Sequence, residues 1–389
     1  MAKKYLFDKL GDIKKHMLLS IVIPTKNRYE YLKHLVVALN SFESADFEVV
    51  IQDNSEDNSE FVDFIIPYLG GRFKYFYCQE HLDVVANSDR AILNSCGEYV
   101  CFIGDDDGVS SRITELAAFM KKNQIDACNC TMGGFQWPDV RYVVHKLIGL
   151  SVPKVKNGVR EINLSIEIAR CLKTGAFSLG DMPRVYHGMV SRVALNIVYH
   201  KTGSFFPGAS PDMANAVALC FAAKKCFHID TPFIISGHGY KSAGGMGARR
   251  QHNGDIEKIP HLPPNTKENW EPLVPLTWTG NTIYADAALK AFCAMGQSSL
   301  LTNFNYAYLY AAVLLFDHRA AQLVWPLMKG PGMKRKAFAA FVRLFILRSK
   351  TFVLNFTHSY LGLSHNDIYP KAVSIGEAID ITDRYIKNL

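Results

Sequence analysis

Alternating apolar runs and helical periodicities in the first third of the chain predict a sheet with crossover helices. Short runs rich in Val, Ile and aromatic residues predict strands at residues 19–24, 47–51, 73–77 and 98–103. Between them, apolar residues recur every three or four positions and predict helices at residues 29–42, 60–69, 85–96 and 111–122. This alternation is typical of an α/β fold with a mainly parallel sheet flanked by helices.

The remainder of the chain is more helical. Periodicity predicts helices at residues 164–172, 194–200 and 212–223, and, after a proline-rich linker, at 285–295, 306–316 and 337–347. We therefore expect three parts: a basic N-terminal segment (1–17), an α/β domain (18–258) and a mostly helical C-terminal extension (259–389).

The composition is that of a globular protein. Of 389 residues, 49% are hydrophobic and 20% charged, which is enough apolar material for a large core. No apolar stretch reaches the roughly 18 residues of a membrane span, and the N-terminus lacks the apolar stretch of a secretory signal. The nine cysteines are an odd number and several lie in apolar runs, as expected of reduced thiols. We expect a cytoplasmic protein.

Positive charge is concentrated near the C-terminus. The net charge is +7, and residues 318–366 contain eight Lys or Arg and no acid. Apolar residues recur there at helical spacing, which fits either a helix on an anionic inner membrane leaflet or a helix bundle that shows its charges to water. No motif for reading nucleic acid accompanies the charge, so nucleic acid is not an expected partner.

Three consecutive carboxylates follow the fourth predicted strand. Asp105, Asp106 and Asp107 come directly after the apolar run 99–103 and precede Gly108. Adjacent carboxylates raise one another's pKa unless a cation shares their site. Hard oxygen ligands suit Mg²⁺ or Mn²⁺, which often complete their shell with substrate phosphates. The triplet therefore predicts a metal and nucleotide diphosphate site, with a solvated acidic turn as the alternative.

Two other strands end in polar residues. Thr25 follows the first predicted strand and Asp53 follows the second. Because ligands of open α/β sheets bind outside the carboxyl ends of the strands, we expect both residues on one rim with the triplet.

Four segments of the chain resemble those of a known family. The matching segments are residues 20–24, 25–28, 49–55 and 97–107, and the resemblance to glycosyltransferase family 2 members of the GT-A fold covers about residues 18–240. It implies that Thr25 and Asp53 bind the nucleotide, with the Asp53 carboxylate accepting the N3 hydrogen of uracil or thymine. A turn residue that caps the second strand is the alternative for Asp53.

The resemblance also implies roles for the triplet. Asp107 would bind the metal directly, while Asp105 and Asp106 would contact ribose, sugar hydroxyls or metal-bound water, with Asp105 also a candidate metal ligand. Gly104 stands where many members have the first acid, which leaves the register open by one residue. His238 would add a nitrogen ligand to the metal.

Further residues follow from the same resemblance. Asn87 and Arg90, three residues apart on one predicted helix, would contact the diphosphate or sugar, with a solvated helix face as the alternative. A glycine-rich basic loop with Arg249, Arg250 and His252 would close over the diphosphate as a lid, unless it is a surface loop without function.

Asp212 is the candidate general base. An inverting transferase needs a base to take the proton of the acceptor hydroxyl, and Asp212 begins a predicted helix where the family places an acid pair. Pro211 replaces the usual first acid, so one carboxylate is present. The alternative is an acid that stabilises the first turn of a helix.

The sequence thus predicts a Mn²⁺- or Mg²⁺-dependent inverting glycosyltransferase. It would move a sugar from a UDP- or dTDP-sugar to a saccharide, free or linked to a polyprenyl diphosphate, in surface polysaccharide synthesis at or near the inner membrane face. A nucleotidyltransferase is an alternative, although residues 25–29 lack the glycine-rich phosphate loop it would need. A non-catalytic module that binds nucleotide sugars or glycans is another.

Overall fold

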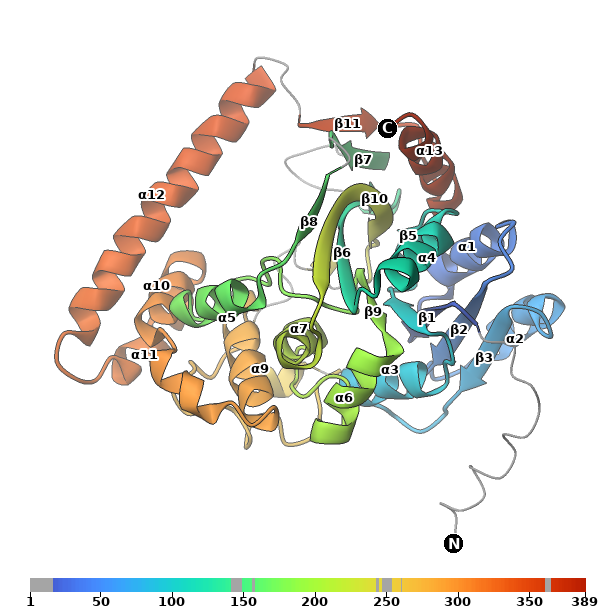
Figure 1. Cartoon of the computed structure of the whole chain (residues 1–389). Coiled ribbons are helices and arrows are strands. Elements are labelled where there is room, and N and C mark those ends of the chain that lie inside the picture. Colours follow the sequence, from blue (N-terminus) through green and yellow to red (C-terminus); the bar gives the residue numbers. More distant parts are fainter. Residues whose placement is uncertain are drawn as a thin grey trace, which may run out of the picture.

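The structure is a computed structural model that describes residues 17–140, 149–155, 158–242, 245–246, 254–259, 261–360 and 365–389. Helices cover both faces of one twisted sheet, and a helical part lies beside it (Figure 1). The predicted α/β fold, a sheet flanked by helices with a mostly helical C-terminal part, is confirmed.

The strands are β1 (Leu19–Thr25), β2 (Phe47–Asp53), β3 (Phe73–Tyr77), β4 (Tyr99–Phe102), β5 (Gly108–Val109), β6 (Ala127–Gln136), β7 (Gly149–Pro153), β8 (Val159–Glu161), β9 (Gly188–Ser191), β10 (Cys226–His238) and β11 (Asn366–Tyr369). The helices are α1 (Tyr29–Asn40), α2 (Ser59–Ile65), α3 (Val84–Leu93), α4 (Ile113–Asn123), α5 (Leu164–Lys173), α6 (Arg192–Thr202), α7 (Pro211–Ala222), α9 (Gly280–Ala294), α10 (Tyr306–Phe316), α11 (Ala321–Val324), α12 (Met333–Tyr360) and α13 (Ile375–Lys387).

The sheet is mixed. Its main path runs β11-β7-β6-β9-β4-β1-β2-β3, and β10 pairs with β5, β6 and β8 off this path. The strands β4, β1, β2 and β3 are parallel, as the sequence predicts. The strand β9 is antiparallel to both of its neighbours, β4 and β6, so the parallel arrangement ends there. The parallel half brings the carboxyl ends of β1, β2 and β4 to one edge.

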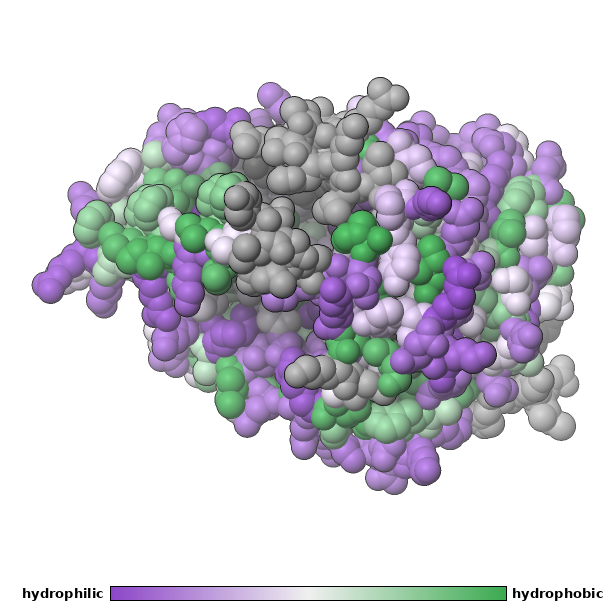
Figure 2. Space-filling view, turned by 90° about the horizontal axis from the view of Figure 1, so that it is seen from above, coloured by the Kyte–Doolittle hydropathy of each residue, from purple (hydrophilic) through white to green (hydrophobic). Residues whose placement is uncertain are grey.

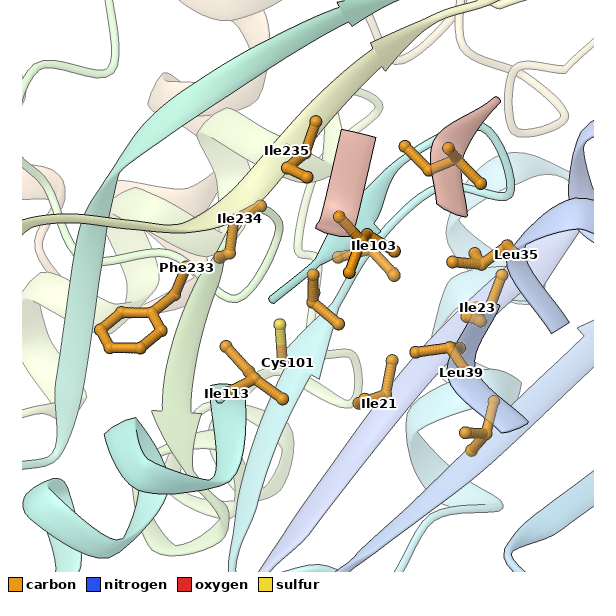
Figure 3. Close-up of a cluster of buried hydrophobic side chains, with 14 of the residues drawn as sticks. Ile21, Ile23, Leu35, Leu39, Cys101, Ile103, Ile113, Phe233, Ile234 and Ile235 are labelled. Carbon is orange, nitrogen blue, oxygen red and sulfur yellow. The ribbon is translucent and has the colours of Figure 1, made fainter. Parts of the chain in front are cut away.

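Alternating side chains of the central strands supply two cores. Ile21 and Ile23 of β1 join the cluster that includes side chains of α1, α4 and α13, while Val22 joins the cluster of α3, α6 and α7. Figure 3 shows the first cluster, with Leu35 and Leu39 of α1 over the strands. This period of two, apolar on both faces, is what a strand covered by helices on both sides requires.

A third core holds the helical part together. The buried side chains of α7, α9 and α10 pack with Trp270 and Trp278. The chain then runs through α12 at one side of the molecule and returns to the sheet, where β11 pairs with β7 and α13 packs on α1 (Figure 1). The predicted boundaries at 17/18 and 258/259 stay predictions, and the C-terminal 24 residues, 366–389, lie against the sheet. Among the described helices, none has the length and apolar character that crossing a membrane requires.

Candidate active site

The carboxyl-end edge of the parallel strands gathers the predicted nucleotide residues. Thr25 and Asp53 are direct register partners at the ends of β1 and β2, and the acidic triplet follows β4, the other neighbour of β1. The Thr25 hydroxyl donates a 2.6 Å hydrogen bond to Oδ2 of Asp105. The structure therefore places these residues on one rim, as their positions after parallel strands predict.

The Asp53 carboxylate is held by three donors. Its Oδ2 accepts hydrogen bonds from the hydroxyls of Tyr29 (2.7 Å) and Tyr75 (2.6 Å), and its Oδ1 accepts from the backbone N–H of Ser55 (2.8 Å). Asp53 has no exposed surface. In this structure the carboxylate fixes the loop after β2, and its contact with a pyrimidine stays a prediction.

Asp105, the first residue of the acidic triplet, is paired with a basic residue that the sequence analysis assigned no role. Arg28, three residues after β1, donates from Nε to Asp105 Oδ2 at 3.1 Å and places Nη2 2.9 Å from Asp105 Oδ1. Its Nη1 lies 3.8 Å from Asp106 Oδ1. Burial raises the pKa of Asp105 to about 7 even though Arg28 opposes the shift. The only sequence signal for Arg28 was its place just beyond a strand of the same rim.

Asp107 is held by three donors of its own. It accepts hydrogen bonds from the backbone N–H groups of Gly104 (2.6 Å) and Gly237 (2.7 Å), and its Oδ2 lies 2.7 Å from Nε2 of His187. Burial acts against ionisation, but His187 and the two N–H groups together hold the pKa of Asp107 below its ordinary value. The Asp107 carboxylate in turn raises the pKa of His187, which burial alone would lower. Asp107 and His187 thus form a buried hydrogen-bonded pair in which each favours the charged form of the other.

His187 has an unusual backbone. Its φ is +56°, a conformation that non-glycine residues seldom adopt, and its ring stacks on that of Tyr186 with centroids 3.9 Å apart. Such strain persists only where the surroundings enforce it and is common at functional sites. A single histidine that reaches Asp107 across 80 positions of sequence gives no local signal, and the sequence analysis missed it.

The carboxylate oxygens of the acidic triplet differ in the hydrogen bonds that they accept. An oxygen without a donor is one that a metal ion could bind. Asp105 Oδ1 is buried and accepts no hydrogen bond of good geometry, although Arg28 lies close to it. Asp106 accepts from the N–H of Gly239 through Oδ2 (3.0 Å), is hydrogen-bonded to the Ser242 side chain, and has its Oδ1 3.8 Å from Nη1 of Arg28. The unsatisfied Oδ1 of Asp105, next to the Asp106 carboxylate in the sequence, fits a hard divalent cation. Asp107, the residue first predicted to bind the metal directly, is the one most occupied by donors within the chain.

Within the described ranges, three or more His, Cys, Asp or Glu side chains nowhere converge in a metal-binding arrangement. Two protein carboxylates are nevertheless a common number for Mg²⁺ or Mn²⁺ sites that share the metal with substrate phosphates. His238 lies between the glycines that bind Asp106 and Asp107, and its side chain is partly exposed. Its role as a metal ligand stays a prediction.

The two predicted residues of α3 have different surroundings. Asn87 is buried and donates from Nδ2 to the carbonyl of Thr25 at 3.5 Å, while its Oδ1 is buried without a hydrogen-bond partner. Arg90 is exposed and contacts Cys78 Sγ at 2.8 Å through Nη1. Only Asn87 therefore joins the rim directly, and an unsatisfied buried amide oxygen is the kind of atom a ligand can complete.

The acid at the start of α7 comes close to this cluster. The electrostatic neighbours of Asp212 are His187, Arg184 and Asp107, and those of Tyr186 and Tyr284 include Asp212. Burial raises the pKa of the Asp212 carboxyl, against the opposing effect of His187 and Arg184. Because a base must be free of strong partners to accept a proton, a partly exposed carboxylate with raised pKa suits that role.

An amide on the same helix fixes this arrangement. Asn215, one turn after the start of α7, accepts from the N–H of Val185 (2.9 Å) and donates to the carbonyl of Phe205 (3.0 Å). It ties the segment that carries Arg184 and His187 to the helix that carries Asp212. Sequence reasoning missed Asn215 and Arg184, because both act through contacts between distant segments. The predicted lid residues Arg249, Arg250 and His252 lie outside the described residues.

The segment 20–181 matches the family model for "Glycosyl transferase family 2". This match covers less than half of the chain. This family 2 region contains Thr25, Asp53, Asn87 and the acidic triplet, whereas His187 and Asp212 come after it. The predicted resemblance is thus confirmed for the residues of the rim.

A curated relative and two solved structures are also similar. Over 106 residues, 27% of this chain, the sequence is 30% identical to the GalNAc(5)-diNAcBac-PP-undecaprenol beta-1,3-glucosyltransferase of Campylobacter jejuni subsp. jejuni serotype O:2 (strain ATCC 700819 / NCTC 11168). The match spans 34% of that protein's length. The structure of S. aureus TarS 1-349 in complex with UDP-GlcNAc is 15% identical, with 83% of this chain and 89% of that chain covered and a TM-score of 0.45.

The mannosyltransferase PcManGT from Pyrobaculum calidifontis, solved in complex with GDP-Man and Mn²⁺, is 14% identical over 88% of this chain and 92% of that chain, with a TM-score of 0.39. Both scores are below 0.5, so we draw nothing about substrate or metal from these two structures.

Proposed function

We propose that the protein is a metal-dependent inverting glycosyltransferase that transfers a sugar from a UDP- or dTDP-sugar to a saccharide or lipid-linked saccharide, in the synthesis of a surface polysaccharide. The observation that carries the proposal is the convergence of the family 2 rim with Asp212 through the Asp107–His187 pair. A residue that only forms a turn, or an acid that only stabilises the first turn of a helix, would not need to lie close to the acidic triplet.

Each residue has a separate task in this proposal. Asp105 and Asp106 would hold Mn²⁺ or Mg²⁺, which when bound supplies the charge that stabilises the departing diphosphate. Asp107 and His187 keep the turn after β4 in place. Asp212 takes the proton from the acceptor hydroxyl as its oxygen attacks the anomeric carbon. Arg28, which neutralises Asp105 in the structure, supplies a positive charge within reach of the phosphates.

We also propose the class of the acceptor and the place of the reaction in the cell. The name of the Campylobacter relative contains a glycan linked to undecaprenol, and an acceptor of this kind would place the reaction at the inner face of the membrane.

The test is turnover with a panel of UDP- and dTDP-sugars, MnCl₂ and a polyprenyl-diphosphate-linked saccharide, with nucleoside diphosphate release as the readout. We expect release that requires both metal and acceptor and that Asp212→Asn abolishes while nucleotide binding persists. Nucleotide binding without turnover on any acceptor would favour the non-catalytic module. Pyrophosphate release from a nucleoside triphosphate would favour the nucleotidyltransferase.

A further inference from the structure

The helix α12 exposes an unusual number of large apolar side chains. Phe338, Phe352 and Phe356 are 70%, 71% and 65% exposed, and Phe345 and Ile346 are 55% and 59% exposed. Single exposed apolar residues are normal on a protein surface, but several bulky ones on one helix mark an interaction site. Seen from above, hydrophobic side chains gather at the left of the molecule, the side on which Figure 1 places α12 (Figure 2).

These side chains form one stripe. Phe338, Val342, Phe345, Phe352 and Phe356 follow one another at intervals of three, four or seven residues, which places them on one face of the helix. We call this set the phenylalanine stripe. It needs a partner outside the helix, because each member is at least 39% exposed.

The stripe is not the face by which α12 packs on the protein. Ala337 and Leu344 are buried, and Phe341 and Ala340 pack beside Leu344 in a cluster with side chains of α10. These positions lie on a different side of the helix, and α10 is the element that α12 contacts most. The bundle explanation for the apolar residues of 318–366 therefore accounts for this inner face and leaves the stripe unexplained.

A row of basic residues lies on a different side of the helix from the stripe, because each member stands two positions before a phenylalanine of the stripe. Lys336, Arg343 and Lys350 are exposed and spaced seven residues apart, so they share a side of the helix. Residues 318–366 contain no acid at all. In the part of the chain that the structure describes, no basic residue of α12 forms an ion pair. The basic row therefore has no neutralising partner on its own helix.

Charge decides what covers the stripe. A second copy of the chain packed through α12 would bring together two helices that each carry six basic residues and no acid, which is unfavourable. An anionic bilayer accepts the aromatic side chains at the boundary of headgroups and acyl chains and attracts the Lys and Arg residues of the same helix. Water alone would solvate the basic row but would leave the phenylalanine stripe without apolar contacts.

We propose that α12 binds in the plane of an anionic membrane surface, with the phenylalanine stripe inserted and the positive charge of the helix attracted by the lipid headgroups. This binding site is independent of the proposed function, because it uses no residue of the rim.

The test is co-sedimentation of the purified full chain with vesicles. One set contains only phosphatidylcholine, and the other contains about a third phosphatidylglycerol. We expect binding to the anionic vesicles that weakens as NaCl is raised, and little binding to neutral ones. The variant Lys336→Glu/Arg343→Glu/Lys350→Glu should bind at least about tenfold more weakly, since each charge near the surface contributes roughly fivefold.

A second variant tests the contribution of the phenylalanine stripe. Phe338→Ser/Phe345→Ser/Phe352→Ser should also bind vesicles at least about tenfold more weakly. Its matched control is Ile166→Ser/Val193→Ser, which removes two apolar residues that are 62% and 68% exposed on other helices and should bind like the unaltered protein. Far-UV circular dichroism and the melting temperature show that each variant is folded.

Three results would overturn the proposal. One is the absence of binding to anionic vesicles at low salt. Another is binding that both α12 variants retain. The third is a lipid-free oligomer, seen by sedimentation velocity, that the phenylalanine variant dissociates while the full chain ignores vesicles; this would assign the stripe to a second copy of the chain.

Discussion

The rim of the sheet and the helix α12 handle charge in opposite ways. On the rim, Asp53, Asp105 and Asp107 are each fully or almost fully buried, and each is matched by donors from segments far away in sequence. On α12, the phenylalanine stripe and the basic row are exposed, and within the described chain the basic row forms no ion pair.

The difference follows from solvation. A buried carboxylate without donors or a counter-charge would be expensive, so the fold must supply them from within the chain before any ligand arrives. An exposed lysine is solvated by water and has no such need. The rim is thus organised in advance for a small charged ligand, whereas α12 is organised for a surface that only its environment can supply.

The largest expected effect concerns the proposed base. Asp212→Asn should lower kcat by roughly 10²- to 10⁴-fold with little change in nucleotide binding, because a positioned base typically contributes that much. Steady-state kinetics and titration with UDP in the presence of Mn²⁺ measure the two quantities. The matched control is Glu115→Gln, which removes the acid from the first turn of α4, where its partner is Arg112. Equal kcat for Asp212→Asn and the unaltered protein would contradict the role of Asp212.

The pH dependence of turnover tests the same role of Asp212 as the base. Burial raises the pKa of Asp212, and a base works only when ionised, so kcat should fall as pH falls through that raised pKa. The acid limb should therefore lie above the value of about 3.9 for an exposed aspartate. A kcat profile that stays flat down to that value would show that no group of this kind controls the reaction.

A smaller effect is expected from the close approach of β10 to the acidic triplet. A Cβ at Gly237 would lie 1.7 Å from the carbonyl oxygen of Asp106, so Gly237→Ala must displace backbone. We expect a loss of about 1–3 kcal/mol in the free energy of unfolding, as for overpacked interiors, together with weaker metal and nucleotide binding. Urea unfolding measures the first.

The neighbouring strand offers the control for this substitution. Gly134 of β6 is paired with Ser236, and a Cβ there would meet nothing within 4 Å. Gly134→Ala should leave stability and binding nearly unchanged. A destabilisation as large as that of Gly237→Ala would indicate a general effect of alanine in this pair of strands.

The smallest effect is expected on α12. Phe345→Ser should change the free energy of unfolding by less than about 0.5 kcal/mol, because a side chain that is 55% exposed contributes little to the core. Leu344→Ala, one position away and buried, should cost more, within the roughly 2–5 kcal/mol range of leucine truncations in protein cores. Comparable losses at both positions would mean that the stripe is packed inside the protein.

The sequence predicted the rim better than the residues around it. The ends of β1, β2 and β4 could be placed because each strand contains a short apolar run, and parallel pairing then brings Thr25, Asp53 and Asp105 together. Arg28 and His187 could not be recognised, because their partners are 77 and 80 positions away and a single basic residue has no periodic context.

The sequence also could not indicate which of the three aspartates is available to a metal. Three adjacent aspartates are equivalent in the sequence, and their differences arise from Gly104, Gly237 and His187, which bind Asp107, whereas Asp105 keeps one unsatisfied oxygen. The antiparallel position of β9 was likewise not predictable, because a run of four residues carries no direction.

The most direct test of the central claim is a calorimetric titration of Mn²⁺ into the protein in the presence of UDP, for the unaltered chain and for Asp106→Asn. Tight, UDP-dependent Mn²⁺ binding that weakens at least about tenfold in Asp106→Asn is the predicted result, because one of two protein carboxylates at the metal is neutralised. Mn²⁺ binding that is absent with UDP, or that is the same in both proteins, would contradict the account of the acidic triplet as a metal and diphosphate site.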